Sequence, residues 1–226
     1  MRGKKAVTLA IFAGVLSVGA TMMWQLAAVS HTQASPRRVP RSADRPIPSM
    51  LKPNDSEVVV EETIGGGDEV QPPPGTSLID WRLQAGLGAF IVQVEDSAAH
   101  LTHSKDWITS SVTLSVITPL RQLDPPLSSG ARIQIEQDGG TMNIGPTKVT
   151  AVRKKLKPLQ VGEKYLLFLD RSKEGDLNFL PQAAYRIVGS DDLEMVSQRV
   201  PRDEIANAGL GKATQSIQNW ITARPR

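Results

Sequence analysis

The sequence predicts a mainly β domain, a small β-barrel or sandwich with a short helix before it and an amphipathic helix after it. Segments in which apolar and polar residues alternate follow one another from residue 89 to residue 198. Turn residues such as Asp-Pro-Pro, Gly-Gly and Gly-Pro separate these segments. No helical pattern lies between them, which favours a sandwich or barrel over an alternating β-α-β sheet.

The elements follow in chain order, within a domain expected to span residues 76–200. Thr76 or Ser77 is suited to cap a short helix, with Leu78, Ile79 and Leu83 at helical spacing. The C-terminal segment, residues 201–226, is predicted to be an amphipathic helix packed on the barrel. Strands are expected at residues 89–95, 107–120, 131–137, 148–152, 163–170, 184–190 and 193–198.

The strand at residues 163–170 is apolar on both faces. Tyr165, Leu167 and Leu169 share one face, and Leu166 and Phe168 share the other, because successive side chains of a strand point to opposite sides. A strand of this kind is covered on both sides. We expect the C-terminal helix that carries Trp220 to cover one of them.

The N-terminal residues predict export across a membrane. A cytoplasmic basic stretch at residues 1–5 precedes an uncharged apolar run at residues 6–29, long enough to span a bilayer as a helix. The run is longer than the apolar core of a cleaved signal peptide, yet residues 31–34, His-Thr-Gln-Ala, would suit a cleavage site. The chain is therefore predicted to be membrane-anchored or, if the segment is cleaved, secreted, with its C-terminal domain outside the cytoplasm.

Residues 30–75 are rich in proline, glycine and charged residues, and they predict a disordered linker. Within them, Ser-Glu-Val-Val-Val-Glu-Glu at residues 56–62 is compatible with a short strand, but we interpret it as an isolated apolar group in a tether.

Composition excludes several classes of site. The chain of 226 residues contains no cysteine, which excludes disulfides, a disulfide-linked partner, thiolate nucleophiles and cysteine-ligated zinc. A net charge of +3 with nearly balanced acids and bases does not by itself indicate nucleic-acid binding.

One motif carries a resemblance. Pro-Leu-x-x-Gly-Glu-Lys-Tyr-Leu-Leu-Phe-Leu at residues 158–169 follows an exported N-terminus, an opening helix and the strands at 89–95 and 107–120, and precedes Tyr-Arg-Ile-Val-Gly at 185–189. This order, from about residue 76 to 197, resembles uncharacterised exported bacterial β-barrel proteins with an OB-like or netrin-module-like core. The resemblance implies that fold and no settled activity. Netrin modules often bind or inhibit extracellular partners through cysteine-containing frameworks, which this chain lacks.

Two arrangements could support catalysis. His100 and His103 lie in an expected hairpin loop, where Glu95, Asp96 or Asp106 would complete a metal site. His100, Ser110 and Asp96 could be listed as a triad, but no Gly-x-Ser-x-Gly motif positions the serine. We interpret both groups as ordinary loop and strand residues, and we assign no catalytic, cofactor-binding or metal-ligating residue.

The basic run at residues 148–157 is the most concentrated charge feature, and Lys154 and Lys155 lie at its centre. OB-type barrels bind single-stranded nucleic acid through such surfaces together with exposed aromatic rings. Since the aromatic residues lie in expected strands, we interpret the run as a solvated edge. Anionic lipid headgroups or acidic polysaccharide are alternative partners.

These features favour a binding or structural module of the bacterial cell envelope over an enzyme, attached to the membrane by its N-terminal helix, with an envelope protein, lipid headgroup or polysaccharide as partner. An exported metal-dependent hydrolase using His100 and His103 is the first alternative. OB-type nucleic-acid binding through residues 148–157 is the second.

Overall fold

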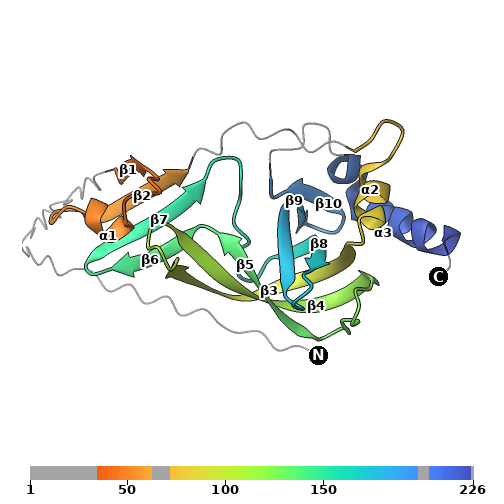
Figure 1. Ribbon diagram of the computed structural model, residues 1–226. Helices are drawn as coiled ribbons and strands as arrows, with labels where there is room; N and C mark the ends of the chain where they lie inside the picture. Colours follow the sequence, from red (N-terminus) through yellow and green to blue (C-terminus); the bar gives the residue numbers. More distant parts are fainter. Residues whose placement is uncertain (1–34, 63–71, 198–203, 225–226) are drawn as a thin grey trace, which may run out of the picture. The chain divides into compact units, whose positions relative to one another are not determined.

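The computed structural model describes residues 35–62, 72–197 and 204–224, and the fold is mainly β with two sheets (Figure 1). The four-stranded sheet has the order β1 (Arg37–Pro40), β2 (Glu57–Glu62), β7 (Thr147–Arg153), β6 (Gly140–Ile144). The six-stranded sheet has the order β10 (Asp192–Met195), β9 (Leu177–Val188), β8 (Lys164–Arg171), β3 (Gly88–Leu101), β4 (Ile108–Arg121), β5 (Arg132–Asp138). The helices are α1 (Ile47–Met50), α2 (Leu78–Gln84) and α3 (Glu204–Ala223).

The six-stranded sheet is antiparallel and curls around a core. Cα atoms of β5 come within 8 Å of those of β9, yet in the described part of the chain no hydrogen-bonded ladder joins an edge of this sheet to another strand. The expectation of a closed barrel is therefore wrong. The alternation of apolar residues predicted the strands but could not show whether the edges pair.

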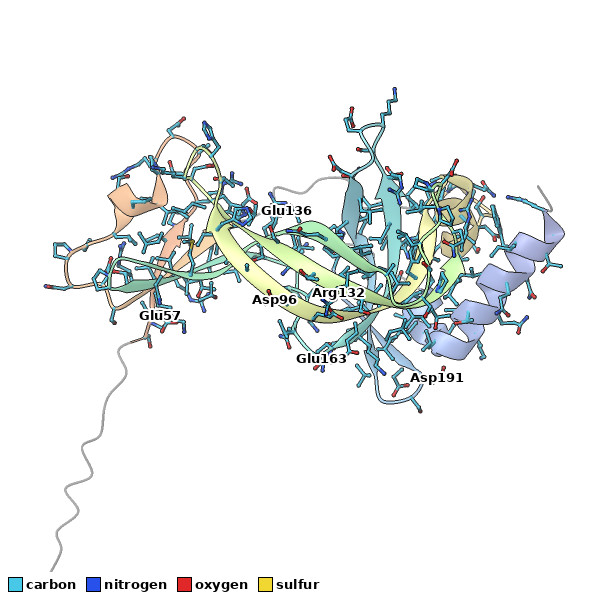
Figure 2. All side chains as sticks on the ribbon, turned by 90° about the horizontal axis from the view of Figure 1, so that it is seen from below. Glu57, Asp96, Arg132, Glu136, Glu163 and Asp191 are labelled. Atoms are coloured by element: carbon cyan, nitrogen blue, oxygen red, sulfur yellow. The ribbon has the colours of Figure 1, made fainter. Side chains whose placement is uncertain are left out.

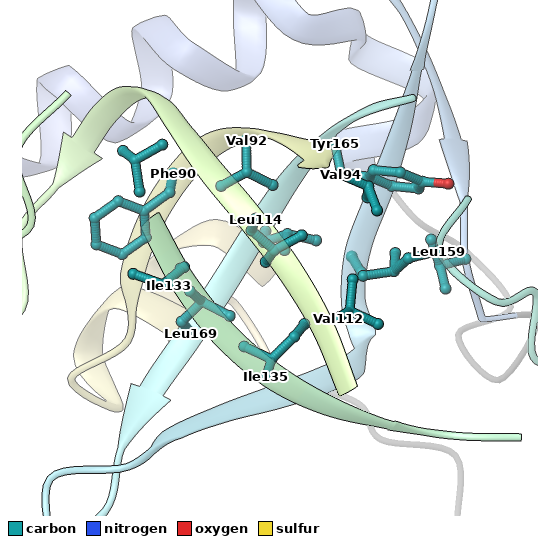
Figure 3. Packing of buried hydrophobic residues seen from close by; sticks show 14 of the residues in the cluster. Phe90, Val92, Val94, Val112, Leu114, Ile133, Ile135, Leu159, Tyr165 and Leu169 are labelled. Carbon is teal, nitrogen blue, oxygen red and sulfur yellow. The ribbon is translucent and has the colours of Figure 1, made fainter. Parts of the chain in front are cut away.

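Strand β8 has both faces buried, as its sequence predicts. Tyr165, Leu167 and Leu169 belong to the core inside the curled sheet, where the apolar side chains of β3, β4, β5 and β8 converge (Figure 3). Leu166 and Phe168 point to the opposite face, into a second core that they share with α2 and α3. A strand without a wet face suits the centre of such a sheet.

Helices α2 and α3 cover this second face. Ser77 caps α2, since its Oγ accepts a hydrogen bond from the Asp80 amide at 3.0 Å. Helix α3 buries Ile205, Ala213 and Ile217, and Trp220 packs at the edge of the same core. This confirms the amphipathic C-terminal helix, with ends at Glu204 and Ala223 within the expected residues 201–226.

Helix α3 is interrupted at Gly209, whose φ of 81° and ψ of 168° are not helical. Asp191, from the turn between β9 and β10, caps the part of the helix that begins after Gly209 (Figure 2). Its carbonyl oxygen accepts from the Leu210 amide at 2.7 Å, and its Oδ1 accepts from the Gly211 amide at 2.6 Å. A carboxylate bound to free amides at the start of a helix is stabilising.

Residues 35–62 correct the prediction of a disordered linker over residues 30–75. They form β1, α1 and β2, and β2 pairs in parallel with both β1 and β7. Val58 and Val60 are fully buried against Ile47 and Val149. Because the strand that pairs with β2 lies about 90 residues later in the sequence, local composition could not reveal this pairing.

The chain passes from β5 of the six-stranded sheet to β6 of the four-stranded sheet at Gly139, which lies between the two strands, and Gly140, which begins β6. Gly140 has a φ of 148°, and a Cβ built on it would lie 2.2 Å from the Ser110 hydroxyl. The sequence predicts a turn at this glycine pair and a strand at residues 148–152, which β7 confirms. The glycine pair also moves the chain into another sheet, and β6 was not predicted.

The remaining predicted strands are confirmed with shifted ends, and β9 pairs with β10 as the closing pair. The N-terminal residues 1–5 and the predicted apolar span at residues 6–29 lie outside the described residues. In the described part of the chain, no helix is both long and apolar enough to cross a bilayer.

We predict that Phe168→Ala lowers the free energy of unfolding by about 3 to 5 kcal/mol, because it leaves a cavity in the core under α2 and α3. Phe168 is fully buried, whereas Val161, in the turn before the same strand, is 58% exposed. Val161→Ala is the matched control and should change stability by less than about 0.5 kcal/mol. Urea denaturation followed by circular dichroism measures both, and equal effects would contradict the assignment of Phe168 to the core.

Candidate functional site

The two histidines of the predicted loop do not form a metal site. His100 lies in β3 opposite Thr109, with its Nε2 3.0 Å from the Thr109 hydroxyl and 3.6 Å from Glu136 Oε2. His103 lies in the exposed turn that follows β3. Over residues 35–62, 72–197 and 204–224, no three His, Asp or Glu side chains are grouped so that they could hold a metal ion.

Ser110 faces away from His100, so these two residues and Asp96 do not form a catalytic triad. His100 pairs with Thr109, so Ser110 points to the opposite side of the sheet, where it is buried. Its hydroxyl donates a hydrogen bond to the Gly139 carbonyl at 2.7 Å. Asp96, exposed on β3, lies among the side chains labelled along the sheet in Figure 2. Through its hydrogen bond to Gly139, Ser110 holds the backbone at the point where the chain passes from β5 to β6.

Asp106 has a lowered pKa, and its role is structural. Hydrogen bonds from the Ser104 hydroxyl and then from the Arg41 guanidinium hold the pKa of Asp106 at about 2, below its ordinary value of 3.8. Arg41 Nη2 lies 2.7 Å from Asp106 Oδ2, and its guanidinium stacks on Trp107 at 4.9 Å. Arg41 also binds Glu62. This cluster ties the chain after β1 to the turn between β3 and β4.

The basic run at residues 148–157 is largely neutralised by neighbouring strands. Arg153 binds both Glu62 and Asp138. Each of the following cations has an acidic partner: Lys148 with Glu57, Lys154 with Glu61, and Lys157 with Glu194. Charges paired in this way are less available to an external polyanion.

A pocket with a mostly apolar lining lies between α2 and β9. Its volume is about 180 Å³. Its lining residues come from α2 and the turn after it, and from one segment of β9: Trp81, Arg82, Ala85, Leu87, Leu180, Gln182 and Ala183. A concave apolar site with few polar groups is the usual form of a small-molecule site.

A bulge in β9 shapes this pocket. Leu167 of β8 pairs with Ala184, and Leu169 pairs with Phe179. Between these two pairs β8 contributes only Phe168, whereas β9 contributes the four residues 180–183. Pro181, which has no amide hydrogen to give to a ladder, lies in this bulge. The bulge removes Leu180, Gln182 and Ala183 from regular pairing, and these three residues form the β9 wall of the pocket.

Arg82 is the charged residue of the lining. It is 4% exposed and lies on the buried face of α2, beside Ile79 and Leu83. Its Nη1 donates to the Tyr185 hydroxyl, and its Nη2 donates to the Gln182 carbonyl, which belongs to the bulge. The guanidinium also lies 5.2 Å from the Phe168 ring centre and 5.3 Å from that of Tyr185.

Sequence reasoning missed this site, although one signal was present. Arg82 follows Leu78 by four residues and Ile79 by three, which places a cation on the apolar face of a predicted helix. The bulge could not be foreseen, because the strand was expected to begin at residue 184, after Pro181.

We predict a pH dependence of stability centred on Asp106. Because its folded pKa is lowered, its contribution is present above the unfolded value and is lost as the pH falls from about 4 to about 2. The loss should be on the order of 1 kcal/mol in wild type and absent in Asp106→Asn, which should already be less stable at pH 7. Urea denaturation at pH 7, 4 and 3 tests this, and parallel pH profiles of the two proteins would contradict it.

Comparison of the chain with protein-family models, with curated proteins and with solved structures finds no match.

Proposed function

We propose that the chain is a binding module of the bacterial cell envelope that holds a small, largely apolar molecule in the pocket between α2 and β9. The observation that carries this proposal is the pocket itself, with a mostly apolar lining, a volume of about 180 Å³ and a wall made by the bulged segment of β9. Bulges are common beside functional sites, where they redirect side chains.

The size of the pocket limits the ligand. A dry cavity of about 150 Å³ accommodates benzene, so a pocket of this volume suits one aromatic ring or a chain of about six carbons. Trp81 and Leu180 supply apolar area for such a molecule, and Gln182 supplies a polar group that can orient it.

The setting rests on the N-terminal sequence. Basic residues before an uncharged apolar run support a membrane anchor or a signal peptide, with the described domain outside the cytoplasm. Within this proposal the curled six-stranded sheet is the OB-like part of the fold. The hydrolase alternative has less support, because His100 binds Thr109 and Glu136 and its ring lies on the exposed side of β3.

We expect a neutral apolar compound, hexan-1-ol, to bind the full chain in lipid nanodiscs with a dissociation constant below about 10 mM, measured by calorimetry against empty nanodiscs. Ala85 is an exposed residue at the pocket, so Ala85→Trp should fill the pocket and weaken binding about tenfold or more. Ala98 is equally an exposed alanine, on β3 away from the pocket, and Ala98→Trp is the matched control. Equal affinities of the two variants, or no binding to wild type, would refute the pocket as the site.

The location has its own test. In intact bacterial cells or spheroplasts, protease added from outside should digest the region from residue 35 onward while a cytoplasmic marker stays intact. Complete protection of that region, with digestion only after lysis, would contradict an extracytoplasmic domain.

A further inference from the structure

We infer that the ligand of the α2–β9 pocket carries one carboxylate, which Arg82 binds, and that its remainder is a short apolar chain or a single ring. This inference rests on the proposed function and names the chemical class that the pocket selects.

The two groups that accept hydrogen bonds from Arg82 carry no negative charge. Its hydrogen bonds go to a tyrosine hydroxyl and to a backbone carbonyl, both of which are neutral. Among the described residues no Asp or Glu forms an ion pair with it, although it is only 4% exposed. Other arginines with little exposure, such as Arg41 and Arg153, each bind two carboxylates. Within the described part of the chain, Arg82 is therefore a buried cation with no acidic partner.

Burial of the Arg82 guanidinium has a free-energy cost. Taking a guanidinium out of water is costly unless an anion or a complete set of acceptors replaces the water. The Phe168 and Tyr185 rings offset part of this cost through their negative faces. Two of the five N–H donors are used in the hydrogen bonds to Tyr185 and Gln182. An anion entering the pocket would supply both the missing charge and further acceptors.

The shape of the guanidinium and the apolar lining of the pocket determine which kind of anion fits. The planar guanidinium matches a carboxylate, which accepts two parallel hydrogen bonds from it. A single cation balances one negative charge, and the rest of the lining is mostly apolar. Short fatty acids and aromatic acids such as hexanoate and phenylacetate meet these conditions within a volume of about 180 Å³.

The test compares hexanoate with hexan-1-ol on the full chain in lipid nanodiscs, by calorimetry against empty nanodiscs. Wild type should bind hexanoate about tenfold more tightly than the alcohol, because the carboxylate adds a negative charge and accepts two parallel hydrogen bonds from the guanidinium, whereas the alcohol is neutral and has one oxygen. Equal affinities would overturn the inference while leaving the proposed function intact. Binding of neither compound would remove both.

Arg82→Met keeps the apolar stem and removes the charge, so the ratio of the two affinities should fall from about tenfold in favour of hexanoate to about twofold or less. The matched control is Arg171→Met. Arg171 also donates to carbonyl oxygens, those of Gly175 and Pro125, and does not line the pocket. An unchanged preference in folded Arg82→Met would refute the assignment.

Should Arg82→Met fail to fold, Arg82→Lys replaces it. Lysine keeps the charge but lacks the planar pair of donors, so the affinity for hexanoate should fall about threefold or more relative to the affinity for hexan-1-ol. An unchanged affinity for hexanoate in that variant would equally contradict the assignment.

Discussion

The pairing of β3 with β4 is the interaction on which the two sheets depend. Each strand has 14 residues, and the two ends of the pair contribute side chains to different cores. Near Phe90 and Val116 the two strands contribute to the core inside the curled sheet. Near Leu101 and Ile108 they pack against the four-stranded sheet. Three register shifts in the half of β3 before Ser97 separate the two ends of the pairing. From Asp96 to Leu101 the register is constant, and a shift by one residue there would expose the buried face. The cluster of Arg41, Asp106 and Trp107 then closes the far end of the hairpin.

The pocket is a consequence of how β8 is covered. Since Leu166 and Phe168 present an apolar second face, the sheet requires helices on that side, and α2 and α3 meet this requirement. Opposite Phe168 the bulge of β9 keeps α2 from packing directly on a regular strand. The space left between helix and bulge is the pocket, and Arg82 spans it to reach the Gln182 carbonyl. The site thus lies where two regular elements fail to match.

Much of the fold follows from the sequence, and its failures share a cause. The two-faced pattern of residues 165–169 predicted the covered strand, and the spacing of Ala213, Ile217 and Trp220 predicted the helix that covers it, because in both cases the signal is local. Val58 and Val60 instead depend on a partner about 90 residues away, and Gly140 changes sheet through a backbone conformation that composition does not specify. Arg82 carried a local signal, but its meaning depends on a bulge in a distant strand.

A purely structural role would explain only part of what surrounds Arg82. As a link between α2 and β9 it contributes two hydrogen bonds, yet a leucine or methionine at the same place would fill the core without the cost of a buried charge. Buried ions that serve stability alone are normally paired with acids, and even the half-buried Arg41 and Arg153 have such partners here. At Arg82 the hydroxyl, the carbonyl and the two rings fix the guanidinium without neutralising it. An oriented cation that has no acidic partner among residues 35–62, 72–197 and 204–224, placed beside an apolar pocket, is the arrangement that a binding site for an apolar acid requires, because orientation is then settled before the ligand arrives.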